Sequence, residues 1–361
     1  MRVLVVGGGI IGCATAYELA KAGAGVVLFE RSTPGAEASS AAAGLLALHG
    51  EPAQSELARL KLASWRLYPD VVRELRELTG IDVEHVTHGT LYPLARGEAA
   101  PAPPAGGPDL GIEVLEGKDL HGLEPALSPR IERAVFLRDD HWLNNQRLVI
   151  AYAQAAARAG VEIRPGSNVS RVLVEAGRAR AVEADGERVS GDAVLLAAGA
   201  WTSELTAPLG VGLTIEPRRG QMLALAHTPP VLTYCVDGEV YLVPRPSGEL
   251  LIGATVERAG FQRAVTAEGI QSLLQRALEL VPSLAGLPIA RTWCGFRPWA
   301  PDGLPVLGPW PGIEGLWLAT GHFRNGILLA PITARLMTDW LTTGKPSVEV
   351  GDFLPERFAR R

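Results

Sequence analysis

The sequence of 361 residues predicts an α/β fold made of two interleaved domains, one built on a parallel sheet with helices and one α+β domain built on a mainly antiparallel sheet. Residues 1–30 follow the order strand, glycine loop, helix and strand, which is the opening unit of a parallel sheet. Residues 215–260 instead alternate apolar and polar side chains between turn signals, as antiparallel strands do. Hydrophobic residues make up 47% of the chain, enough for a substantial core.

The opening unit carries a glycine fingerprint. Gly7, Gly9 and Gly12 form G-x-G-x-x-G between a short apolar strand and an alanine-rich helix, and the next strand ends on Glu30. The first glycine permits a tight turn, the second lets the backbone approach a diphosphate, and the third lets helix and strand pack closely. We therefore predict a Rossmann-like unit that binds the ADP half of a dinucleotide, with the diphosphate at the helix N-terminus and a ribose hydroxyl on Glu30.

A run of small residues, 38–45, follows this unit after a short turn. Small side chains would let a bulky ring system or a diphosphate pass close to the backbone, so we expect a cofactor contact here. A flexible loop or a close-packed helix start would have the same composition.

Helices are expected where apolar residues recur at helical spacing, namely over residues 51–80, 144–160 and 266–281 and in a last helix that runs to residue 341. Pro69 is expected to break the first of these into two pieces. Pro331 must lie in the first turn of the last helix or kink it.

Strands are expected in both domains, at 90–94, 161–163, 169–174, 179–184, 192–198, 221–226, 239–244, 249–254 and 316–319. The run 192–198 is almost continuously apolar, which indicates a parallel strand buried on both faces. It ends at Gly199, on the edge of the sheet where ligands of open α/β sheets bind. Residues 101–108 are rich in proline and glycine and are expected to form an exposed loop.

The domains are discontinuous in this prediction. Residues 1–80, 141–214 and 295–361 are assigned to the nucleotide-binding domain, and residues 81–140 and 215–294 to the substrate domain.

Composition and motifs exclude several classes of function. The net charge of −5 argues against nucleic acid or an anionic membrane as the main partner. The three isolated cysteines, Cys13, Cys235 and Cys294, match no zinc or redox spacing and fit a reducing compartment, so a cytoplasmic protein is expected. Cys13 is expected to be a small core residue. Because no metal motif and no nucleophile elbow is present, a bound organic cofactor must carry any difficult chemistry.

Three places could supply protein-side chemistry. Arg297 lies among bulky apolar residues, where a guanidinium needs an anion; a substrate carboxylate and an ordinary ion pair with Asp or Glu are equally consistent with this. Tyr241 should lie on the opposite face of its strand from Leu242, as a site residue or as a core tyrosine. His322 and Arg324 directly precede a helix N-terminus, which can face a developing negative charge, although His322 alone would fit a structural role.

Several of these features together resemble the D-amino-acid-oxidase superfamily of FAD-dependent amine oxidases, and within it the glycine oxidases of the thiamine pathway. The resemblance runs from residue 1 to about residue 342, and its most specific part is Gly-His-Phe-Arg-Asn-Gly-Ile-Leu-Leu-Ala-Pro at 321–331. It is also carried by Gly7–Gly12, Glu30, residues 39–44, Arg297–Pro298, residues 241–245 and residues 253–255.

The resemblance implies an activity. The expected reaction is oxidative deamination of glycine and other small amines, such as sarcosine and small D-amino acids, by hydride transfer to flavin N5. Dioxygen would be the acceptor, giving the imine or 2-oxo acid, ammonia or an amine, and hydrogen peroxide. The glycine imine would feed thiazole formation in thiamine biosynthesis. The expected partners are therefore a small amine and dioxygen, without nucleic acid or membrane, and a homo-oligomer is compatible with this.

The resemblance also implies roles for individual residues. Arg297 would hold the substrate carboxylate, the Tyr241 hydroxyl would help to position it, and Arg324 would lie near the substrate, while no residue is assigned as general base. No cysteine follows Cys294, so the FAD should be non-covalent. Contacts to FAD are expected from Gly7, Gly9, Ile10, Ile11, Gly12, Glu30, Arg31, Ser39, Ser40, Ala43, Gly44, Leu45, Val169, His322, Phe323, Arg324, Asn325, Gly326, Ile327 and Leu328.

Two departures from the family pattern concern the substrate range. Glu239 stands where histidine is expected, and Val256 stands where methionine is expected near the substrate. Two other functions stay open: a D-amino-acid dehydrogenase that passes electrons to a quinone or carrier, and a flavin-binding protein without turnover. An NAD-dependent dehydrogenase is disfavoured because no second nucleotide-binding half is recognisable.

Overall fold

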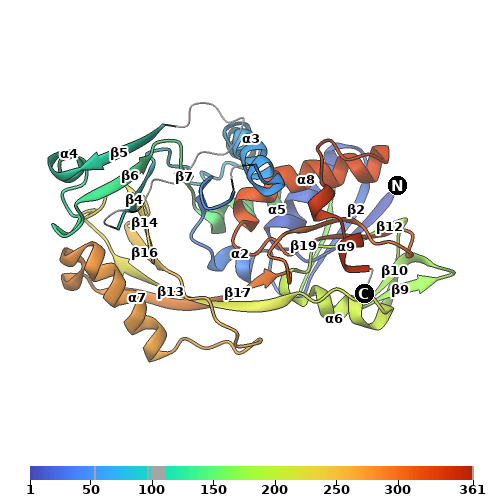
Figure 1. Ribbon diagram of the computed structural model, residues 1–361. Helices are drawn as coiled ribbons and strands as arrows, with labels where there is room; N and C mark the ends of the chain where they lie inside the picture. Colours follow the sequence, from blue (N-terminus) through green and yellow to red (C-terminus); the bar gives the residue numbers. More distant parts are fainter. Residues whose placement is uncertain (53, 96–97, 99–110, 360–361) are drawn as a thin grey trace.

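The computed structural model describes residues 1–52, 54–95, 98 and 111–359 and contains two large sheets (Figure 1). The six-stranded sheet has the order β18-β19-β12-β1-β2-β8, and its neighbours are parallel except for β18 and β19. Its strands are β1 (Arg2–Val6), β2 (Gly25–Glu30), β8 (Glu162–Pro165), β12 (Ala193–Leu196), β18 (Val306–Pro309) and β19 (Leu316–Thr320).

The eight-stranded sheet has the order β17-β13-β16-β15-β14-β4-β6-β5, and only the β14–β4 pair is parallel. Its strands are β4 (Thr90–Pro93), β5 (Ile112–Glu116), β6 (Arg133–Leu137), β13 (Glu216–Ala226), β14 (Cys235–Asp237), β15 (Tyr241–Pro244), β16 (Glu249–Gly253) and β17 (Ile289–Trp299). The two sheets together confirm the predicted fold class.

The six-stranded sheet is covered on both faces. Val3 and Val5 of β1 pack against a helical layer, whereas Leu4 and Val6 pack on the other side against a small antiparallel sheet. The helical layer consists of α1 (Ile10–Lys21), α3 (Glu56–Thr79), α5 (Asn145–Arg158) and α8 (Gly326–Thr343). The small sheet consists of β9 (Val169–Glu175), β10 (Arg178–Ala184) and β11 (Glu187–Ser190). Burial on both faces explains the continuous apolar runs of these strands.

The eight-stranded sheet separates two environments. Leu223 and Leu242 pack against α7 (Ala267–Leu280), which covers the outer face. Their strand neighbours Met222 and Val243 point to the opposite face, toward the rest of the molecule. The remaining elements are short: α2 (Ala38–Ala41), β3 (Leu45–Leu46), α4 (Gly117–Leu123), β7 (His141–Trp142), α6 (Thr202–Thr206), α9 (Glu356–Ala359) and four 3₁₀ turns at Gly199–Trp201, Ala207–Leu209, Pro282–Gly286 and Gly351–Phe353.

The predicted break at Pro69 is wrong, because α3 continues through it from Glu56 to Thr79. A proline removes one N–H from the helix, but the apolar face of α3 packs against α5 and α8, and such tertiary packing supplies most of the stability of a helix in a protein. The helix begins where the Ser55 side chain accepts a hydrogen bond from the Ala58 N–H at 3.1 Å.

Pro331 lies inside α8, beyond its first turn. Its missing N–H frees the carbonyl of Ile327, which accepts a hydrogen bond from the Tyr68 hydroxyl of α3. Ser64, also on α3, donates to the carbonyl of Leu328 at 2.6 Å. Side chains of α3 therefore satisfy the backbone groups at the start of α8.

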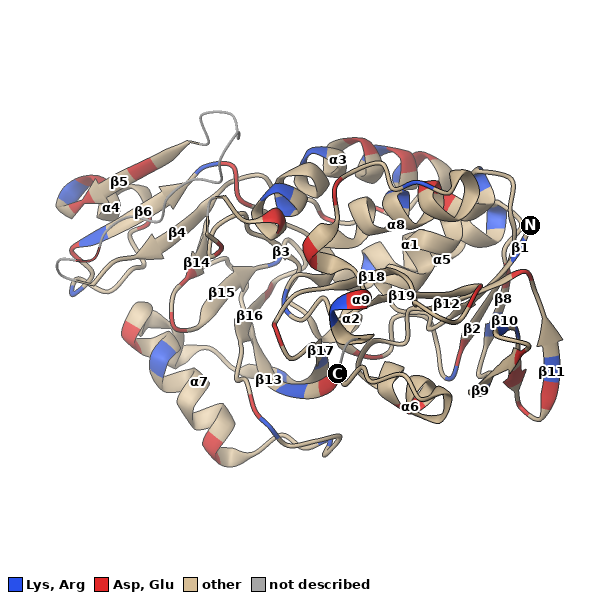
Figure 2. Cartoon of the chain, turned by 45° about the vertical axis from the view of Figure 1, so that its right-hand side comes forward, with Lys and Arg blue, Asp and Glu red and all other residues tan. Residues whose placement is uncertain are grey.

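Charged residues lie mainly on helices and outer loops, while most of the central strands carry none (Figure 2). The six-stranded sheet draws its strands from segments assigned to the nucleotide-binding domain, and the eight-stranded sheet from the substrate segments except for the end of β17. The division into two domains stays a prediction. Residues 101–108 lie outside the described residues. Within the described ranges, no helix is long and apolar enough to cross a membrane.

Candidate active site

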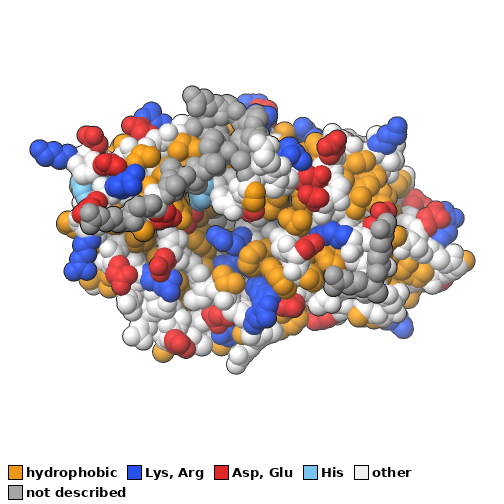
Figure 3. Space-filling view, in the orientation of Figure 1, with side chains coloured by type: hydrophobic (Ala, Val, Ile, Leu, Met, Phe, Trp, Pro, Cys, Tyr) orange, Lys and Arg blue, Asp and Glu red, His pale blue; other side chains and the backbone are white. Residues whose placement is uncertain are grey.

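A cavity of about 610 Å³ lies between the two sheets and is lined by residues of both. This volume falls in the range of roughly 300–1,000 Å³ that is typical for small-molecule and cofactor sites. Charged side chains of both signs are mixed with hydrophobic ones over the face shown in Figure 3, and basic side chains gather near its middle.

The glycine loop forms one wall of the cavity, and its glycines have different structural roles. A Cβ on Gly12 would overlap the carbonyl oxygen of Gly7, so Gly12 is needed for close packing of α1 against the loop. Gly7 has a φ of +110° and is packed against Ala197. A Cβ on Gly9 would meet only the Ser39 hydroxyl, at 3.2 Å, so the space beside Gly9 belongs to the cavity.

Free backbone donors gather at the start of α1. The Ile10 N–H donates to Ser39 Oγ at 2.9 Å, whereas the N–H groups of Ile11 and Gly12 lie in the first turn and have no partner within the helix. The partial positive charge of the helix N-terminus adds to these donors. This end of the cavity can therefore bind a diphosphate.

Glu30 is held at the cavity wall by two backbone groups. Its Oε2 accepts from the Gly8 N–H at 2.8 Å and its Oε1 from the Ser32 N–H at 2.9 Å. Each carboxylate oxygen keeps a further lone pair, so Glu30 can still accept a hydrogen bond from a ribose hydroxyl.

The N-terminus of α8 opens onto the same cavity through Gly326, Ile327 and Leu328. The loop before it is fixed to the end of β17, because the Phe323 N–H donates to the carbonyl of Pro298 at 2.9 Å. The N-termini of α1 and α8, which are far apart in the sequence, thus both lie at the wall of the cavity.

His322 has a structural partner. Its Nε2 lies 3.1 Å from Thr333 Oγ1, and burial lowers the pKa of His322 to about 3, so the ring is neutral. These contacts agree with the structural alternative that the sequence left open.

The small-residue run is held in place by a buried arginine. Arg245 donates from Nη2 to the carbonyl of Ala43 at 2.7 Å and to Asn145 Oδ1 at 2.8 Å. Gly44 adopts a φ of +77°, and a Cβ there would overlap the carbonyl oxygen of Leu143. The wall formed by residues 43–45 is therefore held in place, and Ala43 and Gly44 leave space beside it.

The expected FAD residues converge on this cavity with two exceptions, Gly12 and Ser40. Gly12 is enclosed by the glycine loop itself. The carbonyl of Ser40 accepts a hydrogen bond from Gln146 Nε2 of α5 at 3.2 Å. Free donors at α1, the Glu30 carboxylate and the small side chains of Ala43 and Gly44 fit the FAD that the resemblance implies.

The opposite wall is a row of residues that pair across the eight-stranded sheet. Tyr241 is in register with Gly253 and with Asp237, and Gly253 is in register with Met222. Paired residues point to the same face of a sheet, so this row faces the cavity, whereas Leu242 packs on the α7 side as predicted.

Tyr241 is tightly packed. A Cβ on Gly253 would approach the Tyr241 ring to 2.7 Å, and the hydroxyl lies 3.6 Å from Met222 Sδ. Burial raises the pKa of Tyr241 and outweighs the opposite effect of Arg297, so Tyr241 keeps its proton and can donate it in a hydrogen bond.

Arg297 projects from β17 over Gly220, where a Cβ would overlap the guanidinium. Nη1 donates to the carbonyl of Thr255 at 3.0 Å. Among the residues that the structure describes, no carboxylate lies within ion-pair distance of Arg297, so the alternative of an ordinary ion pair is not realised. Arg297, Tyr241 and Arg324 all line the cavity.

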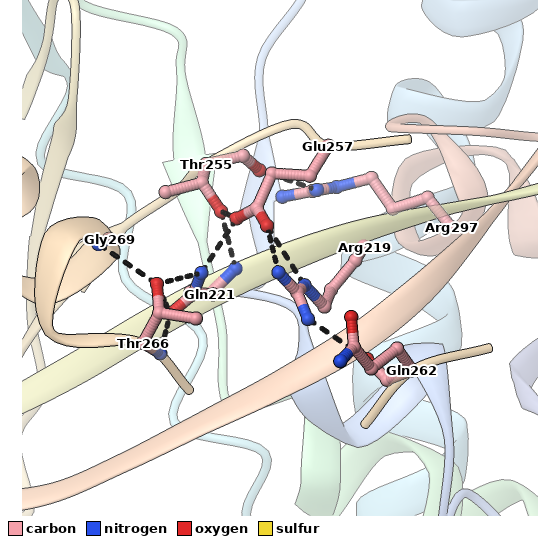
Figure 4. A network of polar contacts seen from close by, with 8 residues as sticks. All are labelled: Arg219, Gln221, Thr255, Glu257, Gln262, Thr266, Gly269 and Arg297. Atoms are coloured by element: carbon pink, nitrogen blue, oxygen red, sulfur yellow. Dashed lines mark hydrogen bonds and ion pairs between the residues drawn. The ribbon is translucent and has the colours of Figure 1, made fainter. Parts of the chain in front are cut away.

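A polar network supports the carbonyl that contacts Arg297 (Figure 4). Glu257 is its centre: Oε1 accepts from Gln221 Nε2 at 2.8 Å and from the Thr255 hydroxyl, and Oε2 accepts from Arg219 Nε at 2.9 Å. The Gln221 N–H also donates to Thr255 Oγ1 at 2.8 Å. These bonds fix Thr255 and, through its carbonyl, the guanidinium of Arg297.

The structure brings further polar residues to the cavity that the sequence analysis missed: His49, Lys61 and Asp237. Lys61 is 3% exposed and its Nζ donates to the carbonyl of His49 at 2.8 Å. A lysine among the buried positions of α3 was a usable signal, because buried lysines need a partner. No local pattern marks His49 or Asp237.

The two departures from the family pattern lie away from the cavity. Glu239 is 76% exposed at its side chain and pairs with Arg276 of α7 at 2.8 Å. Val256 is 57% exposed. Neither lines the cavity.

Comparison with known proteins relates this geometry to a family. The FAD dependent oxidoreductase family model matches residues 2–340. The chain is 34% identical over 360 residues to the glycine oxidase of Pseudomonas putida, with 98% of each chain covered. It is 38% identical over 365 residues to the bifunctional protein ThiO/ThiG of Synechocystis. That match covers 99% of this chain and 54% of the ThiO/ThiG protein. The crystal structure of glycine oxidase from Geobacillus kaustophilus superposes with a TM-score of 0.91, at 34% identity and with 98% of each chain covered.

Proposed function

The chain belongs to the FAD-dependent oxidoreductase family, and from this premise we propose that it oxidises glycine and other small amines, such as sarcosine and small D-amino acids, with dioxygen as the acceptor. One observation carries the proposal. Arg297 presents a guanidinium to the cavity without a carboxylate partner in the described part of the chain. A half-buried guanidinium in this situation is completed by an anionic ligand.

Arg297 and Tyr241 bind and orient the substrate. The guanidinium grips the carboxylate through two N–H groups, and the Tyr241 hydroxyl adds a third hydrogen bond. Because Gly220 and Gly253 leave room for these two side chains to lie against the sheet, their positions are fixed before the substrate arrives. Holding the reacting carbon in one place replaces a random encounter in solution.

Other residues, at the start of α1, at Glu30 and at the start of α8, hold FAD without a covalent bond. The N–H groups at the start of α1 bind the diphosphate and Glu30 binds the ribose. The N-terminus of α8, at Gly326 to Leu328, would stabilise negative charge on bound FAD. When bound, FAD supplies the two-electron chemistry, accepting hydride from the substrate and passing electrons to dioxygen. Cys294, the last cysteine, does not line the cavity.

A place in thiamine biosynthesis is part of the proposal. Supply of the glycine imine for thiazole formation is supported by the similarity to a glycine oxidase and to the bifunctional protein ThiO/ThiG along almost the whole of this chain.

A peroxide assay tests the proposed activity. The purified yellow protein should produce hydrogen peroxide with glycine, sarcosine or small D-amino acids in air. Turnover with dye acceptors but little peroxide would favour a D-amino-acid dehydrogenase instead. Bound FAD that no amine reduces would favour a flavin-binding protein without turnover.

Tyr241→Phe should raise the KM for glycine by about 3- to 10-fold, because one hydrogen bond to the carboxylate is lost. FAD occupancy and the absorbance spectrum should stay unchanged, since the ring still fills its place beside Gly253. Steady-state peroxide kinetics measure the effect. An unchanged KM would show that the hydroxyl does not touch the substrate.

Glu257→Gln should raise the KM by about 2- to 10-fold at almost unchanged kcat, because the weakened network holds Thr255 and Arg297 less firmly. Glu239→Gln is the matched control, since Glu239 lies nearby in sequence but pairs with Arg276 on the outside of the molecule. Equal effects of the two substitutions would contradict a role of the network in positioning Arg297.

A further inference from the structure

Asp237 is placed beside the expected substrate carboxylate site. It ends β14 and pairs in register with Tyr241 of β15, so both side chains project from the same face of the sheet with Cβ atoms roughly 4.5–5.5 Å apart. Both line the cavity, and the Asp237 side chain is only 12% exposed. A carboxylate in such a place needs a compensating cation.

One cation is shared by two carboxylates. His49 Nε2 lies 3.2 Å from Asp237 Oδ2, and His49 Nδ1 lies 3.2 Å from Oδ2 of the buried Asp140. Burial alone would lower the pKa of His49, but the two carboxylates raise it to about 9. Even with an imidazolium at its centre, the group of three residues keeps one net negative charge.

The charged groups around this cluster do not cancel that charge. Lys61 donates to the carbonyl of His49 and interacts electrostatically with Glu51, whose Oε1 lies 3.9 Å away, and with Asp140 and Asp237. With Lys61 and Glu51 counted, the enlarged group still keeps one net negative charge. Arg297 and Arg324 line the same cavity and supply positive charge for the substrate carboxylate. The Tyr92 ring, 5.7 Å from the His49 ring, and the Tyr241 hydroxyl are neutral neighbours.

A negative cluster next to the carboxylate anchor matches a zwitterion, in which an ammonium and a carboxylate are separated by one carbon. We propose that Asp237, held by His49 and Asp140, forms an ammonium subsite that binds the substrate's amino group and accepts one proton from it. This inference rests on the proposed function and adds a proton acceptor to it.

The proton step is balanced within the site. One N–H bond of the ammonium breaks, an O–H bond forms on Asp237, and the electron pair stays on nitrogen. The substrate then becomes a neutral amine, whose Cα–H bond is the better hydride donor. The cluster becomes electrically neutral, since the imidazolium of His49 is balanced by Asp140. His49 and Asp140 are positioning residues in this scheme.

The test is Asp237→Asn, which keeps the shape and removes the charge, with Glu239→Gln on the same segment as control. Two ligands are compared in the FAD-loaded protein: glycine, by peroxide kinetics, and acetate, which has a carboxylate but no ammonium, by its perturbation of the visible FAD spectrum. The KM for glycine should rise by about 10- to 100-fold. Acetate should bind as tightly as in the wild type or more tightly, because a repelling charge has been removed.

The pH dependence separates this role from a structural one. In Asp237→Asn, kcat/KM for glycine should climb with pH as the free amine becomes more abundant. In the wild type, kcat/KM should depend less on pH, because Asp237 accepts the proton from the ammonium form. Equal weakening of glycine and acetate, or no change in either, would overturn the ammonium subsite while the oxidase activity of the wild type stands. A wild type that oxidises no amine would instead overturn the proposed function, and the subsite with it.

Discussion

Arg297→Ala is expected to raise the KM for glycine by roughly 30- to 4,000-fold while FAD stays bound. The substitution removes both N–H groups that are proposed to bind the carboxylate, and removing one partner of a desolvated charge-assisted pair costs about 2–5 kcal/mol. The proposed FAD contacts lie elsewhere, at α1 and at the start of α8, so the protein should remain yellow. Steady-state peroxide kinetics and the visible spectrum measure the two parts of this prediction.

Two further variants test whether the guanidinium of Arg297 causes the rise in KM. Arg297→Lys keeps the charge but loses the two-pronged geometry, so its KM should lie between those of the wild type and Arg297→Ala. Arg291→Ala, on the same strand, removes an exposed arginine that pairs with Glu249 at 2.8 Å and should leave the kinetics unchanged. Unchanged kinetics in Arg297→Ala would exclude Arg297 from the substrate site.

Gly9→Val is expected to give a folded but colourless protein with at least about tenfold lower FAD occupancy. A Cβ at Gly9 would meet only the Ser39 hydroxyl, so the fold can accept the substitution, but the branched side chain would enter the space beside the free N–H groups of α1. Absorbance relative to protein concentration measures the occupancy, and circular dichroism verifies the fold.

Gly12→Val is the contrasting variant. Its side chain would collide with the backbone of the glycine loop, so we expect loss of soluble protein and not a selective loss of FAD. A yellow and active Gly9→Val enzyme would contradict the assignment of the glycine loop to the diphosphate.

Local patterns predicted much of the fold, because helical spacing and apolar runs depend on residues that are close together in the sequence. The helical spacing of apolar residues over 144–160 and 266–281 is visible in the sequence, and α5 and α7 form there. The apolar run at 192–198 becomes β12, beside β1 in the parallel sheet. The break at Pro69 was wrong because tertiary packing of α3 outweighs the loss of one helical hydrogen bond.

Other features depend on contacts between distant segments and were not predictable. The strand β17, which carries Arg297, was missed because Pro298 and a cluster of aromatic residues interrupt its alternation. The pairing of Asp237 with Tyr241 follows from sheet register, and the contact of His49 with Asp140 joins residues from separate elements. Family resemblance supplied Arg297 and Tyr241, whereas the polar cluster around His49 emerged only from the structure.

The most direct test of the account is the anaerobic mixing of the yellow protein with glycine, followed by admission of air. Oxidation of a small amine at this site predicts that the FAD absorbance is lost on mixing and returns in air with one hydrogen peroxide for each glycine consumed. Arg297→Ala at the same glycine concentration should stay yellow. Bound FAD that neither glycine, sarcosine nor a small D-amino acid bleaches would contradict the proposed function.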